Sequence, residues 1–148
     1  MMKKVRMLLA SLSLLAAAAP VFASDERPID VSELPARARQ FIETHFADAK
    51  VSYATVDGQL LDKEYEVVFT DGRKVEFAKN GEWEQVDAKR GSFPMSVLPQ
   101  SIHTYLRQNH PDTPVSKIDR DRRGYEVELR NGLELDFDRN GRLLKIDD

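Results

Sequence analysis

Residues 65–81 read YEVVFTDGRKVEFAKNG, in which two alternating apolar and polar runs are joined by Asp-Gly and followed by Asn-Gly. Alternation with a period of two predicts strands that bury one face and expose the other. Asp-Gly and Asn-Gly favour type I′ turns, in which both central residues have positive φ. The stretch therefore predicts consecutive β-hairpins within an antiparallel sheet.

The same pattern occurs a second time, at residues 125–141, which read YEVELRNGLELDFDRNG. Further upstream, SELP at residues 32–35 matches SVLP at residues 96–99. The matches keep the same order along the chain and need only one gap, which is the signature of an internal duplication. We therefore expect repeat 1 to span residues 32–90 and repeat 2 to span residues 96–148.

Each copy begins with a helical pattern and continues with alternating segments. Apolar residues recur at spacings of three and four, which predicts a helix with one apolar stripe. These residues are Leu34, Ala38, Phe41, Ile42 and Phe46 in the first copy, and Leu98, Ile102, Tyr105 and Leu106 in the second. We expect an α+β fold of two tandem helix-plus-four-strand antiparallel repeats, with the helices on one face of the sheet or sheets and the other face open to water.

The first 23 residues have the features of a secretory signal peptide. Lys3, Lys4 and Arg6 precede an apolar run, and small residues stand before a cleavage site at Ser24. An uncleaved membrane anchor is the alternative. Cleavage would leave 148 − 23 = 125 residues with a net charge of 19 − 25 = −6. We expect a periplasmic or secreted protein whose residues 24–31 form a flexible N-terminus.

The composition excludes several classes of function. The chain has no cysteine, which excludes disulfides, thiol catalysis and cysteine-based zinc sites. An acidic exported protein is a poor candidate for binding nucleic acid or anionic lipid. No apolar stretch after residue 23 is long enough to insert into a membrane. The partner we expect is an unknown protein or peptide, and the oligomeric state stays open.

The end of the chain resembles a calcium-binding loop. Asp136, Asp138, Asn140 and Asp147 fit the spacing of the EF-hand oxygen ligands, with Gly141 at the turn position. However, Asp136 and Asp138 alternate with apolar residues as on a strand, and the chain ends before an exit helix could form. A hairpin explains the pattern without a metal, so we predict no cofactor and keep calcium as the weaker alternative.

No catalytic constellation is evident. The three histidines have no shared metal spacing, and no nucleophile elbow accompanies a serine. A hydrolase that uses a carboxylate pair remains an alternative, because acidic residues are abundant. We predict a non-enzymatic protein.

The open face of the predicted sheet is the best candidate for a binding surface. Strand parity places mostly acidic side chains on it, and Trp83 follows one of the turns. Trp83 either packs on the core or anchors a protein partner, and the acids either are merely solvated or bind a basic partner. The candidate partner-binding residues are Glu66, Glu76, Trp83, Glu126, Glu128, Glu134 and Asp136. Inhibition of a peptidase or another enzyme is one form that such binding would take, and a small-ligand or calcium-binding envelope protein is the alternative.

Several strings resemble a known family. They are FAKNGEW at residues 77–83, SVLP at 96–99 and the run RGYEVELRNGLELDFD at 123–138. The chain resembles the PepSY-like, beta-lactamase-inhibitor-like (BLIP-like) family of exported bacterial proteins. The resemblance implies a repeated helix-plus-four-strand unit and binding of an enzyme across the open sheet face. Ala78 departs from the acidic residue usual in this pattern, which Asp138 keeps, and the chain lacks the disulfides of the true inhibitors.

Overall fold

The computed structural model describes residues 25–148, so the predicted signal peptide, residues 1–23, lies outside the described residues. The described part contains nine strands, two short α-helices and two 3₁₀ helices, labelled η. In chain order these are β1 (Arg27–Ile29), η1 (Val31–Glu33), α1 (Ala36–His45), β2 (Val51–Asp57), β3 (Glu64–Phe69), β4 (Lys74–Ala78), β5 (Trp83–Asp87), η2 (Met95–Val97), α2 (Gln100–Asn109), β6 (Val115–Arg120), β7 (Gly124–Leu129), β8 (Glu134–Asp138) and β9 (Leu143–Asp147).

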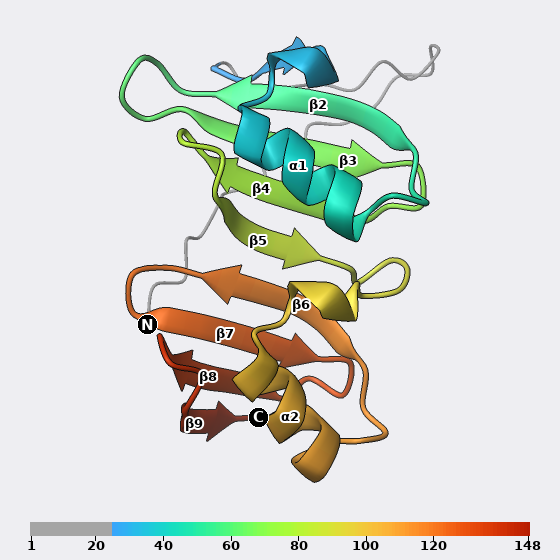
Figure 1. The fold of residues 1–148 in the computed structure, drawn as a ribbon, viewed down its shortest axis with the longest axis vertical. Helices are drawn as coiled ribbons and strands as arrows, with labels where there is room; N and C mark the ends of the chain where they lie inside the picture. Colours follow the sequence, from blue (N-terminus) through green and yellow to red (C-terminus); the bar gives the residue numbers. More distant parts are fainter. Residues whose placement is uncertain (1–24) are drawn as a thin grey trace, which may run out of the picture.

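All nine strands form one antiparallel sheet in the order β1-β2-β3-β4-β5-β6-β7-β8-β9. Figure 1 shows α1 lying over the first strands and α2 over the last ones, both on the same face of the sheet. The opposite face carries no helix (Figure 1). Every strand therefore has its sequence neighbours as its spatial neighbours, and the two outer strands are β1 and β9.

The predicted fold class of two tandem helix-plus-four-strand repeats is wrong. The molecule is mostly one open, continuous nine-stranded sheet with only two helices of ten residues each. The sheet does not stop at residue 90, because β5 pairs with β6 through Val86 opposite Ile118 and Asp87 opposite Lys117. A separate first sheet would leave the backbone groups of β5 unpaired at its edge, and the pairing with β6 satisfies them.

Part of the predicted flexible N-terminus, residues 24–31, has regular structure. Residues 27–29 form β1, which pairs with β2 and supplies the ninth strand. A capping box at η1 then follows: Asp30 Oδ1 accepts from the Ser32 N–H at 2.9 Å, and the Asp30 N–H donates to Glu33 Oε2 at 2.7 Å. These bonds stabilise the start of η1, which leads the chain from the sheet edge toward α1.

The hairpins form at the predicted dipeptides, but the predicted type I′ turns are wrong. Within residues 25–148 only glycines have positive φ, among them Gly72 at 91° and Gly81 at 86°. The Phe69 N–H donates to the Arg73 carbonyl at 2.9 Å, so the first loop contains the three residues 70–72. A three-residue loop needs positive φ only at its last residue, and glycine supplies it.

The core lies between the helices and the apolar face of the sheet. Ala38 on α1 and Ile102 on α2 are fully buried. The rings of Phe46 and Phe69 stack with centroids 4.5 Å apart. The alternation predicted for the strands is confirmed, because Val67, Val75, Phe77, Val86, Val127, Leu129, Leu135 and Phe137 are all buried while their sequence neighbours are not.

Candidate functional site

One row of side chains crosses the open face of the sheet and is almost entirely acidic. Cross-strand pairing places Glu66 opposite Glu76, Glu76 opposite Gln85, and Gln85 opposite Asp119. The series continues with Asp119 opposite Glu126 and Glu126 opposite Asp136. We call Glu66, Glu76, Gln85, Asp119, Glu126 and Asp136 the acidic row. Since neighbouring strands lie about 4.8 Å apart, the row spans about 24 Å from β3 to β8.

The next row of the same face has mixed charge. Lys74 lies opposite Asp87, Asp87 opposite Lys117, and Lys117 opposite Glu128. These opposite charges on neighbouring strands stabilise a sheet. Lys117 Nζ lies 3.3 Å from Asp119 Oδ2 and 3.9 Å from Glu128 Oε2. The Lys117–Asp119 ion pair joins the mixed row to the acidic row, and beyond Glu128 the mixed row also continues with acids, Glu134 and Asp147.

The crowding of carboxylates perturbs the pKa of Glu126. Burial raises this pKa, and repulsion from Glu134, Asp136 and Asp119 raises it further, while Lys117 opposes the shift. Burial by itself would lower the pKa of Lys117, but the carboxylates of Asp119, Glu128 and Asp87 outweigh burial and raise it. The repulsion between carboxylates on β6, β7 and β8 therefore involves the predicted partner-binding residues Glu126, Glu134 and Asp136.

Gln85 interrupts the acidic row at its middle. Its Nε2 donates to Asp119 Oδ1 at 2.6 Å, across the β5–β6 boundary. The amide is thus a neutral donor between carboxylates on both sides. This bond holds the Asp119 side chain in place beside Glu126.

Trp83 does not share the face of the acids. It lies opposite Phe77, and its ring contacts Phe41 and Tyr125 at centroid distances of 6.1 and 6.3 Å. The guanidinium carbon of Arg120 lies 4.4 Å from the ring centroid, and Arg120 also donates to the Trp83 carbonyl at 2.8 Å. Trp83 is therefore half-buried on the helix side, where it joins the two parts of the core.

The residues of the calcium-like motif do not converge. Asp138 lies opposite Gly124 at one end of β8, whereas Asp147 lies opposite Glu134 at the other end, about 13 Å away. Asp138 Oδ1 accepts from the N–H groups of Asn140 and Arg142, so it closes the β8–β9 turn. Within residues 25–148 no three His, Asp or Glu side chains are grouped to hold a metal ion.

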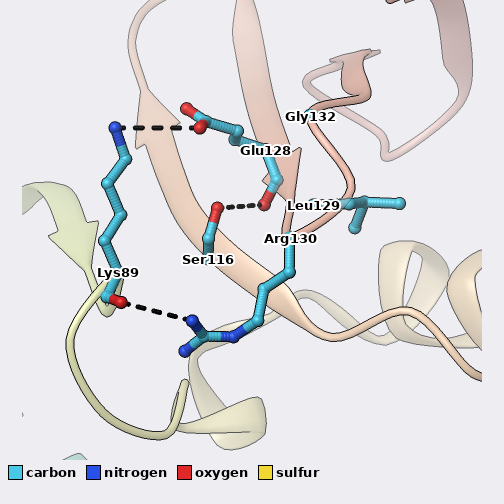
Figure 2. A pocket seen from close by; sticks show the side chains of 6 residues that line it. All are labelled: Lys89, Ser116, Glu128, Leu129, Arg130 and Gly132. Atoms are coloured by element: carbon cyan, nitrogen blue, oxygen red, sulfur yellow. Dashed lines mark hydrogen bonds and ion pairs between the residues drawn. The ribbon is translucent and has the colours of Figure 1, made fainter.

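A hollow of about 260 Å³ lies beside the connection between the two helix-bearing parts (Figure 2). Its polar groups are engaged in bonds with the chain itself: Ser116 Oγ donates to the Glu128 carbonyl at 3.1 Å, and Lys89 Nζ lies 3.7 Å from Glu128 Oε1. Arg130 donates to the carbonyls of Ala88, at 2.9 Å, and of Lys89 and Gly91. The hollow is below the usual size of ligand pockets, and its side chains fasten residues 88–91 to the sheet.

Two features of the exposed surface were missed by sequence reasoning. Asp119 belongs to the acidic row, and the alternation of charged residues in 115–120 could have revealed it. The loop between β2 and β3 exposes Leu60 and Leu61, which are 79% and 84% accessible. This loop joins Asp57 to Glu64, a cross-strand pair at the end of the acidic face. An exposed apolar pair next to an acidic surface is typical of a contact with another protein.

The family model described as "Putative beta-lactamase-inhibitor-like, PepSY-like" matches residues 63–145. The chain belongs to this PepSY-like family. The predicted resemblance is thereby confirmed over the whole of β3 to β8 and the first part of β9. Among curated proteins, none matches the chain.

Solved structures of similar sequence come from Bacteroides. One, described as a putative calcium-regulated periplasmic protein of Bacteroides thetaiotaomicron, is 48% identical with a TM-score of 0.80 and covers 84% of this chain and 98% of its own. A putative periplasmic protein of the DUF2874 family from Bacteroides vulgatus is 43% identical with a TM-score of 0.80, covering 86% and 100%. A third, described as a putative periplasmic protein of unknown function from Bacteroides vulgatus, is 40% identical with a TM-score of 0.76, covering 83% and 99%.

These neighbours confirm the predicted periplasmic location. Among the helices of residues 25–148, none has the length and apolar character needed to cross a membrane. The PepSY-like family and the periplasm are thus what the comparisons establish for this protein.

Proposed function

We propose that this protein is a non-enzymatic periplasmic binding protein whose open sheet face binds a basic segment of another protein. The observation that carries the proposal is the pairing of like charges in the acidic row. Glu66 lies opposite Glu76, and Glu126 lies between Asp119 and Asp136. Like charges directly opposite each other destabilise a sheet. A cationic partner would relieve this repulsion, which makes the surface complementary to Lys- and Arg-rich segments.

The surroundings of the row support a protein partner. The face is long enough for several cationic side chains, and the exposed Leu60 and Leu61 lie at its end. The raised pKa of Glu126 means that the row gains negative charge as pH increases through that pKa. Binding of a cationic segment would favour the ionised Glu126, so affinity would rise with pH over that range. Inhibition of a peptidase or another enzyme would follow if the bound segment lay near the enzyme's active site.

The location of the carboxylates favours a binding role over catalysis. The carboxylates of the row lie side by side on the helix-free face of the sheet. The hollow in Figure 2 contains a single acidic side chain, Glu128, which lies near Lys89. Acid–base catalysis of hydrolysis would need two perturbed carboxyls around one substrate site.

The test compares two variants with the same change of charge. The row variant carries Glu66→Gln, Glu76→Gln and Glu126→Gln, whereas the control carries Glu43→Gln, Asp48→Asn and Asp112→Asn, which are exposed on α1 and in the loops after the helices. Each is titrated by calorimetry with an extended Lys- and Arg-rich peptide at low salt. We expect the row variant to lose at least about tenfold in affinity and the control to lose less than about threefold. Equal losses in both variants would contradict binding at the row.

Calcium binding is the second candidate, favoured by the description of the 48% identical neighbour as calcium-regulated. The ion would be held on the open face around Asp136, which lies opposite Glu126. Further carboxylates would have to move to complete the site, because within residues 25–148 no three are grouped to hold a metal ion. Calorimetry with calcium chloride distinguishes the candidates. Heat and a rise in melting temperature that disappear in Asp136→Asn would support the ion, whereas no response would remove this candidate and leave peptide binding unaffected.

A further inference from the structure

The two edges of the sheet differ in how they are protected. At one edge β1 covers β2, and at the other β9 pairs only with β8. The β9 edge exposes apolar side chains, with Leu144 at 66% and Ile146 at 47% accessibility. An exposed edge strand with apolar residues is a template for pairing with another strand. The question is which strand would fit it.

The pairing of β5 with β6 inside this chain shows what kind of strand can pair with β9, because β5 and β9 are similar. WEQVD of β5 and LLKID of β9 both follow an Asn-Gly turn and have the same bulge opposite the preceding strand. β5 pairs antiparallel with β6, with Val86 opposite Ile118 and Gln85 opposite Asp119. A strand of the β6 type is therefore a partner that accepts such an edge.

Among the strands of residues 25–148, β2 is the other strand that has the same pairing pattern as β6, and β1 already occupies its edge. Ala54, Thr55 and Val56 of β2 correspond to Ile118, Asp119 and Arg120 of β6, since both strands have the same bulge after their first residue. Ile29 lies opposite Ala54 and Pro28 opposite Thr55. β1 thus pairs with β2 in the register in which β5 pairs with β6. Ile29 takes the place of Val86 and packs against the core.

β1 is suited to closing an edge but not to extending it. It has three residues, and Pro28 has no N–H to donate to a further strand. A short strand with proline is a common way to prevent edge-to-edge association. The contact of Ile29 with the core is its main apolar anchor, because Arg27 and Pro28 are exposed.

We propose that β1 is a plug that keeps the β2 edge closed to β9 of a second copy of this chain. When β1 is displaced, β9 of one molecule pairs with β2 of the next, with Ile146 opposite Ala54 and Lys145 opposite Thr55. The charges are compatible in that register, because Lys145 then stands between Asp136 of its own chain and the start of the acidic row of the next. The interface is head-to-tail, so it builds open chains of molecules rather than closed dimers.

The first experiment loosens β1 in the otherwise complete chain. Ile29→Asp, and more strongly Ile29→Asp with Val31→Asp, replaces its apolar anchors with charge. Sedimentation equilibrium should show a mass that increases with protein concentration in these variants and a monomer in the matched control Leu60→Asp. Adding Ile146→Lys to the double variant should restore the monomer, because a charge on β9 blocks edge pairing.

The second experiment checks the register. Because the chain has no cysteine, introduced thiols report only the contact being tested. Thr55→Cys and Lys145→Cys, placed on separate molecules of the Ile29→Asp variant, should form an intermolecular disulfide, since cross-strand neighbours lie within its Cα range. Asp57→Cys with Lys145→Cys is the off-register control and should form none.

Three results would overturn the proposal. The double variant could keep its circular dichroism spectrum yet remain monomeric at every concentration. It could lose the whole fold, which would make β1 part of the structural core and not a removable plug. Finally, assembly that persists with Ile146→Lys would show that β9 is not the partner edge. None of these outcomes depends on whether the acidic row binds a peptide.

Discussion

Strands β5 and β9 are similar in sequence and opposite in environment. Val86 of β5 is fully buried, whereas Ile146, at the matching place in β9, is 47% accessible. Each lies on the helix side, opposite Val75 and Leu135 respectively. The difference comes from the neighbour on the far side, because β6 pairs with β5 whereas β9 is an outer strand of the sheet. The position of a strand in the sheet, and not its own pattern, decided how much of it is buried.

A similar contrast holds at the first residues of the two strands. Trp83 is half-buried under Arg120 and contacts Tyr125 of β7, so it joins the two parts of the core. Leu143, at the matching place in β9, is also half-buried and packs against the core, but it lies on an outer strand of the sheet. A large aromatic residue is useful where two parts of a core meet, and a leucine is sufficient at the edge.

The largest difference in stability between variants of β5 and β9 should come from a charge placed at their matching positions, Val86 and Ile146. Val86→Asp should lower the free energy of unfolding by at least about 3 kcal/mol, because it places an unpaired carboxylate in the core. Ile146→Asp should cost less than about 1 kcal/mol, because water reaches that position. Urea unfolding of both variants provides the comparison, and similar midpoints would show that β5 is not inside a continuous sheet.

Removal of the first side chain of β5 or of β9 should give a smaller difference in the free energy of unfolding. Trp83→Ala should cost about 2–3 kcal/mol, through lost aromatic contacts and the lost contact with Arg120. Leu143→Ala should cost about 1 kcal/mol, since the side chain is only partly buried. Thermal unfolding measures both, and a cost at Trp83 no greater than that at Leu143 would contradict its role in joining the core.

A third comparison of β5 with β9 places an additional carboxylate on the open face, at Gln85 or at Lys145. Gln85→Glu removes the bond to Asp119 and sets a charge between Glu76 and Asp119, so it should destabilise by about 1–2 kcal/mol at neutral pH. Lys145→Glu breaks the ion pair with Asp147 and sets a charge beside Asp136, but the position is exposed, so it should destabilise less than Gln85→Glu does. The part of the penalty that comes from repulsion should decrease as the pH falls through the ordinary carboxyl range around 4. A penalty that does not depend on pH would point to packing rather than charge.

The smallest effect concerns Glu126, whose pKa is raised by burial and by neighbouring acids. Its ionised form is disfavoured by folding, so the penalty is fully present above the raised pKa and absent below the ordinary value of 4.5. Glu126→Gln should therefore stabilise the protein slightly at neutral pH and leave it unchanged in acid. Glu128→Gln is the control, because it breaks ion pairs with Lys89 and Lys117 and should destabilise slightly. Urea midpoints at both pH values test the pair of variants.

Local features were predictable because their causes are local. Alternation identified which residues of β3, β4, β7 and β8 are buried, and glycine identified the turns. The turn type was mispredicted because dipeptide preference ignores loop length, which the strand register decides at Phe69 and Arg73. The flexible N-terminus was mispredicted because three residues such as Arg27–Ile29 carry too little pattern to reveal a strand that depends on β2.

The side chains that share the open face were predictable from the sequence, but their alignment in a row across the strands was not. Strand parity placed Glu66, Glu76, Glu126 and Asp136 on one face. Their alignment in a single row depends on the pairing of β5 with β6, which brings Gln85 and Asp119 between the two sets. Trp83 was grouped with the acids, but the bulge in β5 leaves it on the helix side, opposite Phe77.

The sequence by itself determined the hairpins, the apolar faces, the acidic character of the open face and the family, because each depends on residues close together in the chain. The tertiary structure decided that the strands form one sheet, that the carboxylates align across it, and that one edge is covered while β9 is exposed. Pairing between strands depends on backbone hydrogen bonds, which any sequence can supply. Only the folded chain therefore shows which edges meet and which remain open.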